Sequence, residues 1–352
     1  MNRLDVILEL LTPAFWSGAD QKQLELRSQS VKGILRWWWR AVVGDKGQEP
    51  DKLLATEAKL FGSSEFKLKS PLWLKLSPLD EVNLKDYGGD SWQCGKVVRS
   101  GTYQIDALQY LAYGPVATVG KSERDKHGRA FDTKFNDPSG KYKRGLILKR
   151  PALEVGARLL LELTWRDNTI AKEGLEQLFR AIAALIAFGG IGSRSRKGWG
   201  ALELVDIKGE PKSLVEITHS QIEHARKEFM EDPGATSLAP VPRWPTVEYR
   251  RLCAQVGPNN DWKQVLGELG VRYKGLKTTV PKANHWIFGS ANPRRASSVL
   301  LTVKKDSAGK LMGFIWAFPS TKSATEEGAD GWEQFLRKCS RGSVEESKRV
   351  RK

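Results

Sequence analysis

Cysteine is scarce in this sequence of 352 residues, and its three copies, Cys94, Cys253 and Cys339, are far apart. Their number and spacing predict no disulfide framework and fit a reducing compartment. No stretch reaches the roughly eighteen uncharged apolar residues of a membrane span. The N-terminus carries Asp5 where a secretion signal would be apolar. We therefore expect a cytoplasmic protein that is not associated with a membrane.

Groups that catalyse reactions or bind metals are also few. The histidines are His127, His219, His224 and His285, and His219 and His224 have the wrong spacing for two zinc ligands on one helical face. The Gly-Gly-Asp turn at 88–90 is followed by a serine, so it lacks the second acid that two-metal chemistry needs. We expect no metal, no cofactor and no active site. His127, in a charged loop, is a minor candidate for a general base.

Positive charge and tryptophan are in excess. Lys and Arg number 57 against 41 Asp and Glu, which gives a net charge of +16. Thirteen Trp stand beside seven Tyr. At 40% hydrophobic and 28% charged residues the chain is globular, and its length is that of two domains. The surplus of positive charge indicates a polyanion or an acidic protein as partner.

The hydrophobic pattern of the first part of the chain predicts an α+β unit over 1–208. It contains, in order, a strand at 4–11, a helix at 31–43, a short helix at 53–61, a strand at 72–76, a strand at 158–165, a helix at 175–186 and a strand at 201–207. Apart from the short helix, this is the βαββαβ order of a ferredoxin-like (RRM-like) domain. Residues 77–152 have a weak pattern, and we interpret them as an insertion that contains a mobile loop.

The remainder, 209–352, predicts a second α+β unit of degenerate ferredoxin-like type. Its expected elements are helices near 221–231, 261–269 and 331–339, and strands at 299–303 and 312–318. The fold prediction is thus two ferredoxin-like βαββαβ units with a large insertion in the first. The charged tail after residue 345 is expected to fray.

The helix at 31–43 carries a basic stripe in which Lys32, Arg36 and Arg40 are four residues apart. Like charges at this spacing destabilise an isolated helix, and Gly33 in its middle costs about 1 kcal/mol more. Bound phosphates would offset the repulsion, and a glycine admits a close backbone. The alternative is that the stripe is a solvated face and that the neighbouring tryptophans, 37–39, are core or interface residues.

A second candidate is the glycine-rich loop 189–200, which holds Ser193, Arg194, Arg196 and Lys197 and no acid. Glycines let successive amides converge on an anion, and Arg adds bidentate phosphate contacts. The loop lacks the spacing of a Walker loop or a dinucleotide fingerprint, so a nucleotide cofactor is disfavoured. A loop that follows a nucleic-acid backbone fits better. The alternative is a flexible turn between helix and strand.

Three segments together resemble the RAMP superfamily. They are TPAFWSGAD at 12–20, LRSQSVKGILRWWWR at 26–40 and the glycine-rich loop. Within that superfamily they are similar to the first-numbered subunits of the Cmr complex, the type III-B CRISPR RNA-targeting effector. A looser similarity covers 284–318, where Ser298 stands at a position that is commonly Pro in that family.

The resemblance implies a non-catalytic RNA-binding subunit near one end of a CRISPR ribonucleoprotein for antiviral defence. Its implied partners are guide RNA, single-stranded target RNA and other Cmr subunits. The matching positions of the implied RNA surface are Lys32, Arg36, Trp37, Trp39, Arg40, Ser193, Arg194, Arg196, Lys197, Trp199, Arg294 and Arg295.

Two other functions stay open at this point. Some RAMP relatives are metal-independent RNA endonucleases. The chain could also act chiefly in assembly, with its Trp residues packed against another subunit.

Overall fold

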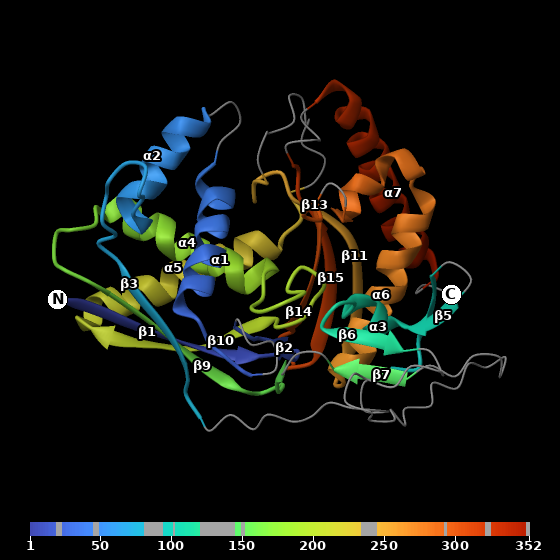
Figure 1. The fold of residues 1–352 in the computed structure, drawn as a ribbon, viewed down its shortest axis with the longest axis horizontal. Coiled ribbons are helices and arrows are strands. Elements are labelled where there is room, and N and C mark those ends of the chain that lie inside the picture. The colour runs from blue at the N-terminus through green and yellow to red at the C-terminus, as the bar shows by residue number, and fades with distance from the viewer. Residues whose placement is uncertain are drawn as a thin grey trace.

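The structure is a computed structural model that describes residues 1–18, 23–44, 49–80, 94–100, 103–119, 145–148, 152–233, 245–291, 294–320 and 325–349. The chain forms two α+β units, each built on an antiparallel sheet (Figure 1). The predicted mixed α and β architecture is therefore confirmed.

The first unit is a four-stranded sheet in the order β10-β1-β9-β3. Every neighbouring pair in it is antiparallel. Its strands are β1 (Asn2–Leu10), β3 (Trp73–Pro78), β9 (Arg158–Trp165) and β10 (Leu202–Glu210). Its helices are α1 (Ser28–Val43), α2 (Pro50–Phe61), α4 (Lys172–Phe188) and α5 (Lys212–Met230). The sequence predicted all four strands and all four helices to within a few residues at most ends.

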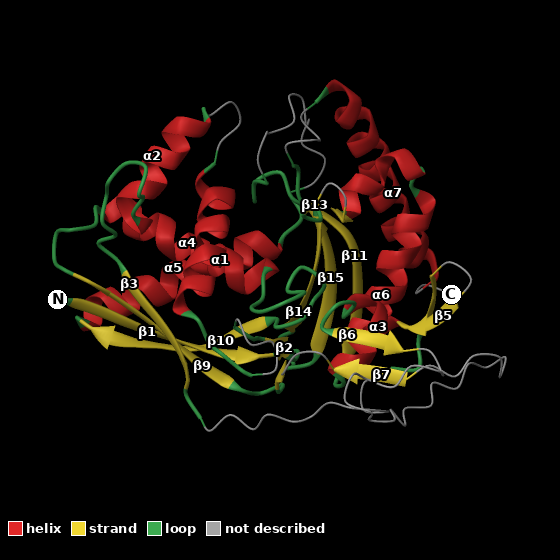
Figure 2. Ribbon diagram, viewed as in Figure 1, coloured by secondary structure: helices red, strands yellow, loops and turns green. Residues whose placement is uncertain are grey.

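Alternation along the strands places the core of this unit on one face of the sheet. Leu4, Val6 and Leu8 of β1 are buried together with the apolar stripe of α4. Figure 2 shows the helices on that same side of the sheet. The opposite face carries charged side chains that pair with one another. Arg3 contacts Asp5 at 2.9 Å and Glu162 at 2.7 Å.

The second unit is a three-stranded sheet in the order β11-β15-β14. Its elements are β11 (Arg251–Asn259), α6 (Trp262–Thr279), the 3-10 helix η2 (Lys282–Phe288), β12 (Ser290–Ala291), β13 (Arg294–Arg295), β14 (Val299–Lys305), β15 (Leu311–Ala317) and α7 (Glu326–Arg349). The sequence did not predict β11, because Gly257 and Pro258 interrupt its second half. Helix α6 runs ten residues beyond the predicted end.

The described part of the insertion packs against the second unit. It includes β4 (Val97–Ser100), β5 (Tyr103–Asp106), α3 (Ala107–Leu111), β6 (Val116–Val119) and β7 (Gly145–Leu148). Leu108 and Leu111 of α3 share a core with Leu266 and Leu269 of α6. The short strands β2 (Ala14–Phe15) and β8 (Ala152–Leu153) pair at its base. The predicted mobile loop, 121–144, lies outside the described residues.

Helix α5 was assigned from sequence to the second unit, but it packs with the first. It contacts α4 and β10, and its buried Ile222, Ala225 and Phe229 belong to the core of the first sheet. A boundary at 208/209 therefore separates α5 from the elements that bury it. The apolar face of a helix does not by itself say which sheet covers it.

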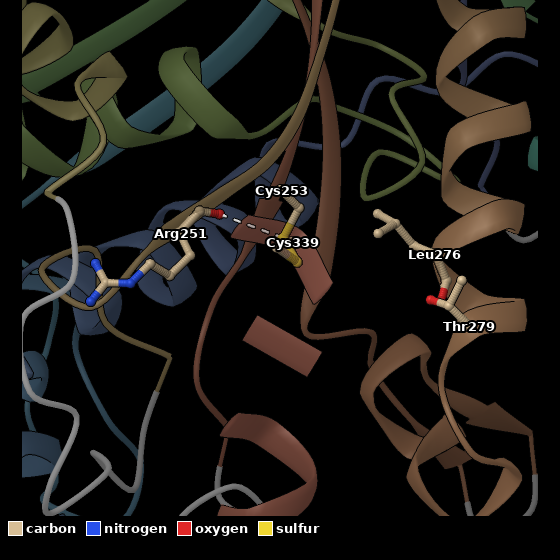
Figure 3. Close-up of a disulfide and its surroundings, with 5 residues drawn as sticks. All are labelled: Arg251, Cys253, Leu276, Thr279 and Cys339. Atoms are coloured by element: carbon tan, nitrogen blue, oxygen red, sulfur yellow. Dashed lines mark hydrogen bonds between the residues drawn. A yellow bond between two sulfur atoms is a disulfide. The ribbon is translucent and has the colours of Figure 1, made fainter. Parts of the chain in front are cut away.

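The expectation of no disulfide is wrong for one cysteine pair. Cys253 of β11 and Cys339 of α7 form a disulfide that ties the C-terminal helix to the second sheet (Figure 3). Leu276 and Thr279 in the same view belong to the end of α6. Cys94 is buried beside Asp106, and burial raises the pKa of its thiol to about 11. The cysteine pattern therefore gives no support to a reducing compartment.

A buried lysine joins the two units. Lys304 of β14 is 6% exposed, and its Nζ donates to the Leu202 carbonyl of β10 at 2.5 Å. Burial lowers the pKa of Lys304 to about 7, with a smaller lowering from Arg226 and an opposing effect from Glu203. The ammonium form is thus disfavoured in the folded chain.

This lysine predicts a pH dependence of stability. Between about pH 7 and the ordinary lysine pKa of 10.5 the unfolded chain binds the proton that the folded chain lacks. Stability therefore rises with pH in this window, by at most about 1.4 kcal/mol per unit. Urea unfolding at pH 7 and pH 9 should show this rise in the parent and not in Lys304→Met. Lys305→Met, whose side chain pairs with Glu9 at the surface, serves as control. Equal pH profiles for the parent and Lys304→Met would contradict the prediction.

Candidate nucleic-acid interface

Helix α1 is fixed to the first unit by its apolar face. Val31, Leu35 and Trp38 are at most 3% exposed. Trp38 stacks on Phe188 of α4 with ring centroids 5.8 Å apart, and its indole nitrogen lies against Gly189. A Cβ at Gly189 would come within 2.7 Å of that nitrogen. The glycine that ends α4 is therefore needed for the close packing of α1.

A buried acid lies beneath the basic stripe of α1. Arg36 and Arg40 both form ion pairs with Glu57 of α2 at 2.5 Å, and the Glu57 side chain is 1% exposed. The two arginines keep 34% and 40% of their side chains exposed. The sequence interpretation required phosphates to offset the repulsion within the stripe, but Glu57 offsets it inside the protein. A single carboxylate still leaves a net positive charge over the two guanidinium groups.

The other two residues of the stripe differ in their surroundings. Lys32 is half-buried, and its pKa is lowered by burial first and by Arg36 second. Gly33 is exposed, and a Cβ there would meet nothing within 4 Å. The open space at Gly33 is compatible with the predicted close approach of another backbone.

The glycine-rich loop is a folded junction and not a flexible turn. A Cβ at Gly192 would meet the Phe15 carbonyl oxygen at 2.4 Å, and one at Gly200 would meet the Ile191 carbonyl oxygen at 2.0 Å. Both residues have a positive φ, +81° and +67°. These glycines are required by the packing of the protein's own backbone.

The loop amides are also largely used within the protein. Those of Ile191, Ser193, Lys197, Gly198 and Gly200 donate to backbone carbonyls at 2.7–3.3 Å. These five amides cannot converge on an anion as the structure stands. The expected nest of amides is therefore not present at these positions, and the side chains of the loop remain as the groups that could bind one.

The basic side chains of the loop reach three different elements. The Arg196 guanidinium lies 4.6 Å from the centre of the Trp37 ring of α1 and donates to the Ser297 carbonyl at 2.9 Å. Lys197 donates to the Tyr273 hydroxyl of α6 and, at 3.3 Å, to Ser297 Oγ. Burial lowers the pKa of Arg196 and lowers that of Lys197 well below its usual value. The exposed Arg194 lies over the Tyr113 ring at 5.9 Å.

Two of the predicted tryptophans are not on the surface. Trp39 is 1% exposed against Phe61, and Trp199 is 0% exposed between Phe15 and Trp262. Neither can stack on a base in this structure, so both belong to the core and not to a binding surface. Trp37 is half-buried and remains a candidate. Arg294 and Arg295 lie in β13, and their side chains are outside the described part of the structure.

The tryptophan excess is mainly a property of the core. Seven of the thirteen are below 9% exposed: Trp16, Trp38, Trp39, Trp165, Trp199, Trp316 and Trp332. Large indoles bury much apolar area, and here they fill the space between sheets and helices. The number of Trp residues therefore says little about RNA.

The structure brings the two predicted basic segments together, through Arg196 and Trp37. It adds Tyr113, Tyr273 and Ser297, which sequence reasoning missed because none belongs to a local basic or glycine-rich pattern. RRM domains bind RNA through aromatic side chains on the open face of the sheet. Here Arg3, Asp5 and Glu162 on the central strands form ion pairs instead.

Other kinds of site find no support among the described residues. No group of three or more His, Cys, Asp or Glu side chains in these ranges is placed to hold a metal ion. No described helix has the length and apolarity to span a bilayer. His127 and the turn at 88–90 lie outside the described residues.

Known proteins resemble the chain in sequence. The CRISPR system Cmr subunit Cmr1-2 of Pyrococcus furiosus is 27% identical over 202 residues, which are 56% of this chain and 92% of that protein. Subunit Cmr1-1 of the same organism is 23% identical over 282 residues, 75% of this chain and 69% of that protein.

The fold is also shared with solved structures. The crystal structure of Cmr1 from Pyrococcus furiosus, in its apo form, has a TM-score of 0.54 at 19% identity, covering 90% of this chain and 88% of that one. A chain of the type III-B Cmr-beta complex bound to cognate target RNA has a TM-score of 0.53 at 12% identity, with 96% and 99% covered. The sequence model of the RAMP superfamily matches residues 7–203, more than half of the 352 residues. The chain belongs to the RAMP superfamily.

Proposed function

We propose that this chain is an RNA-binding subunit of a type III-B CRISPR effector ribonucleoprotein of the Cmr kind. It contacts guide RNA and single-stranded target RNA near one end of the complex, beside other Cmr subunits. The curated relatives are named Cmr subunits, and one solved relative is a complex with cognate target RNA. These names support the proposal, as does the net charge of +16.

We also infer that both units are ferredoxin-like. In the first, the order β10-β1-β9-β3 is that of a βαββαβ domain whose fourth strand pairs with the first. In the second, β11, α6, β14, β15 and α7 follow the same course, and the described residues provide no fourth strand.

The observation that carries the proposed function is the contact between Arg196 and Trp37. It joins the basic helix α1 and the glycine-rich loop, which are far apart in sequence, into one surface. Arg36 and Arg40 are partly exposed on that helix, and Arg194 is exposed in the loop. Guanidinium groups bind phosphate in a bidentate manner, and their planes stack on bases.

The double variant Arg36→Ala/Arg40→Ala tests this function. We expect single-stranded RNA to bind about 10-fold or more weakly than to the parent at moderate salt, because about two phosphate contacts are lost. The slope of log affinity against log salt should become shallower by about 1.4. Fluorescence anisotropy with a labelled RNA at several salt concentrations measures both quantities.

Arg158→Ala is the matched control. Arg158 is 48% exposed and, like Arg36 and Arg40, is paired with a carboxylate, in this case Asp80 at 2.9 Å. It lies on the first sheet and away from α1, so its loss should leave RNA affinity unchanged. If the double variant binds RNA like Arg158→Ala, the α1 surface does not bind RNA.

The nuclease alternative depends on a general base near a 2′-hydroxyl. His127 is the sequence candidate, and it lies outside the described residues. Incubation of the protein with labelled guide-precursor and target RNAs in EDTA shows whether it cleaves RNA without a metal ion. Cleavage that His127→Ala abolishes would favour an endonuclease over a non-catalytic subunit.

One observation also favours a role in assembly. Phe66 and Leu68, between α2 and β3, and Trp73, the first residue of β3, are 40%, 45% and 43% exposed. Exposed apolar side chains gathered in one segment are typical of protein interfaces. Co-purification with other subunits that persists after ribonuclease digestion would show direct protein contacts, which are compatible with RNA binding.

A further inference from the structure

Of the segments of the sequence that contain cations and no acid, four meet in the fold. They are 26–44, 107–122, 177–202 and 269–305, and an Asp or Glu stands immediately before and after each of them. The longest, 269–305, holds eight Lys and Arg residues. In a chain with 41 acids, such segments are places where positive charge has no acidic neighbour along the chain.

The fold brings these four segments together around the glycine-rich loop. Arg196 of 177–202 reaches Trp37 of 26–44, and Arg194 reaches Tyr113 of 107–122 at 5.9 Å. Lys197 reaches Tyr273 of 269–305. Segments 107–122 and 269–305 also meet directly, because Lys274 lies 5.5 Å from the centre of the Tyr110 ring.

The cationic groups at this junction lie close enough to lower one another's pKa. The charged groups that lower the pKa of Lys197 are Lys277, Arg194 and Arg196, after burial as the largest cause. Lys277 of α6 has its own pKa lowered by burial and by Lys274. On α1, in contrast, Arg36 and Arg40 share the carboxylate of Glu57. The positive charge at the junction therefore adds to the net positive charge that remains on the helix.

An exposed aromatic ring accompanies this charge. Tyr113, just after α3, is 70% exposed, and one part of its ring is covered by the Arg194 guanidinium. An exposed ring held beside a guanidinium is a platform on which an unpaired base can stack. A base within a duplex is already stacked and paired, so this platform selects a single strand.

We propose that a single-stranded RNA crosses this junction from the first unit onto the second, with a base stacked on Tyr113 and phosphates bound by Lys274 and Lys277. This proposal rests on the proposed function and extends its surface to the insertion and to α6. Lys197 is held by Tyr273 and Ser297, and burial lowers its pKa well below the usual value, so it is not among the groups proposed to bind phosphate. Lys277 also lies in the last turn of α6, where a cation complements the helix dipole, but that role requires neither Tyr113 nor Lys274.

The experiment compares variants by anisotropy with one labelled RNA, first as a single strand and then annealed to its complement. Tyr113→Ala should weaken single-strand binding about 5- to 100-fold with an unchanged salt slope, and Tyr113→Phe should bind like the parent. Lys274→Ala/Lys277→Ala should weaken binding and reduce the salt slope by about 1.4. Duplex binding should respond less to Tyr113→Ala.

Matched controls are Trp73→Ala, an aromatic of 43% exposure on β3, and Lys75→Ala/Lys208→Ala, two lysines of the first sheet with 69% and 66% exposed side chains. These should bind RNA like the parent. If the Tyr113 and Lys274/Lys277 variants also bind like the parent while Arg36→Ala/Arg40→Ala binds weakly, the junction is not the path and the proposed function stands. If none of the variants weakens binding, or the parent does not bind RNA, both proposals fail.

Discussion

Gly200→Ala is expected to destabilise the chain by about 3–5 kcal/mol. Gly200 has φ +67°, and the added methyl group would lie 2.0 Å from the Ile191 carbonyl oxygen, which is backbone and cannot rotate away. The amides of Gly200 and Ile191 also hold the loop to Pro13 and to itself, at 2.9 Å each. Room for a methyl group would therefore have to come from opening the loop. Urea or thermal unfolding followed by circular dichroism measures the loss.

Gly309→Ala separates the cost of a side chain on left-handed backbone from the cost of the contact with the Ile191 carbonyl oxygen. Gly309, in the turn between β14 and β15, has φ +75° and open space where the Cβ would be. Its substitution carries only the left-handed backbone penalty, about 1–2 kcal/mol. Equal losses at positions 200 and 309 would show that the close approach to Ile191 contributes nothing. The comparison also tests whether the glycines of this loop serve packing, as the geometry indicates.

Arg250→Met is the second large effect, with an expected loss of about 3–5 kcal/mol. Arg250 is 5% exposed, and its guanidinium donates to the carbonyls of Glu228, Phe229 and Glu231 at 2.6–2.7 Å and to that of Val247 at 3.0 Å. It thus caps the C-terminal end of α5, where carbonyls lack helical partners. A methionine fills part of the volume but leaves these buried acceptors without a donor.

Arg180→Met is the matched control for this variant. Arg180 also contacts Phe229, with its guanidinium 5.1 Å from the ring centre, and pairs with Glu228 at 3.1 Å. Its side chain is 41% exposed, so solvent screens the pair and the loss should be below about 1 kcal/mol. A loss at Arg250 no larger than that at Arg180 would contradict the capping role.

The elements of the first unit could be predicted because their signals are local. Strand β9 has the predicted bounds, and α1, α4 and β10 extend the predicted segments by a few residues. Alternation and helical spacing report which face of an element is buried, and neighbouring residues carry that information. Strand β11 lacks such a signal beyond Val256, since a Gly-Pro pair follows.

The candidate site was predicted in its segments and not in its chemistry. Arg194, Arg36 and Arg40 do lie at the surface, whereas Trp39 and Trp199 are core residues. The basic and aromatic residues in a helix sequence do not indicate which face of the helix is covered by a second helix. Glu57, which pairs with two of the predicted cations, is 21 residues from Arg36 and carries no motif of its own.

The sequence by itself determined the α+β class, the surplus of positive charge, its concentration in α1 and the glycine-rich loop, and the superfamily. These properties follow from the composition, the short-range periodicity and the residues of the motifs. Only the tertiary structure decided that Glu57 neutralises part of α1, that the loop glycines serve backbone packing, that Cys253 pairs with Cys339 and that Tyr113 lies beside Arg194. Charge compensation, steric contact and bonding depend on distances between atoms that are far apart in the chain, and folding sets those distances.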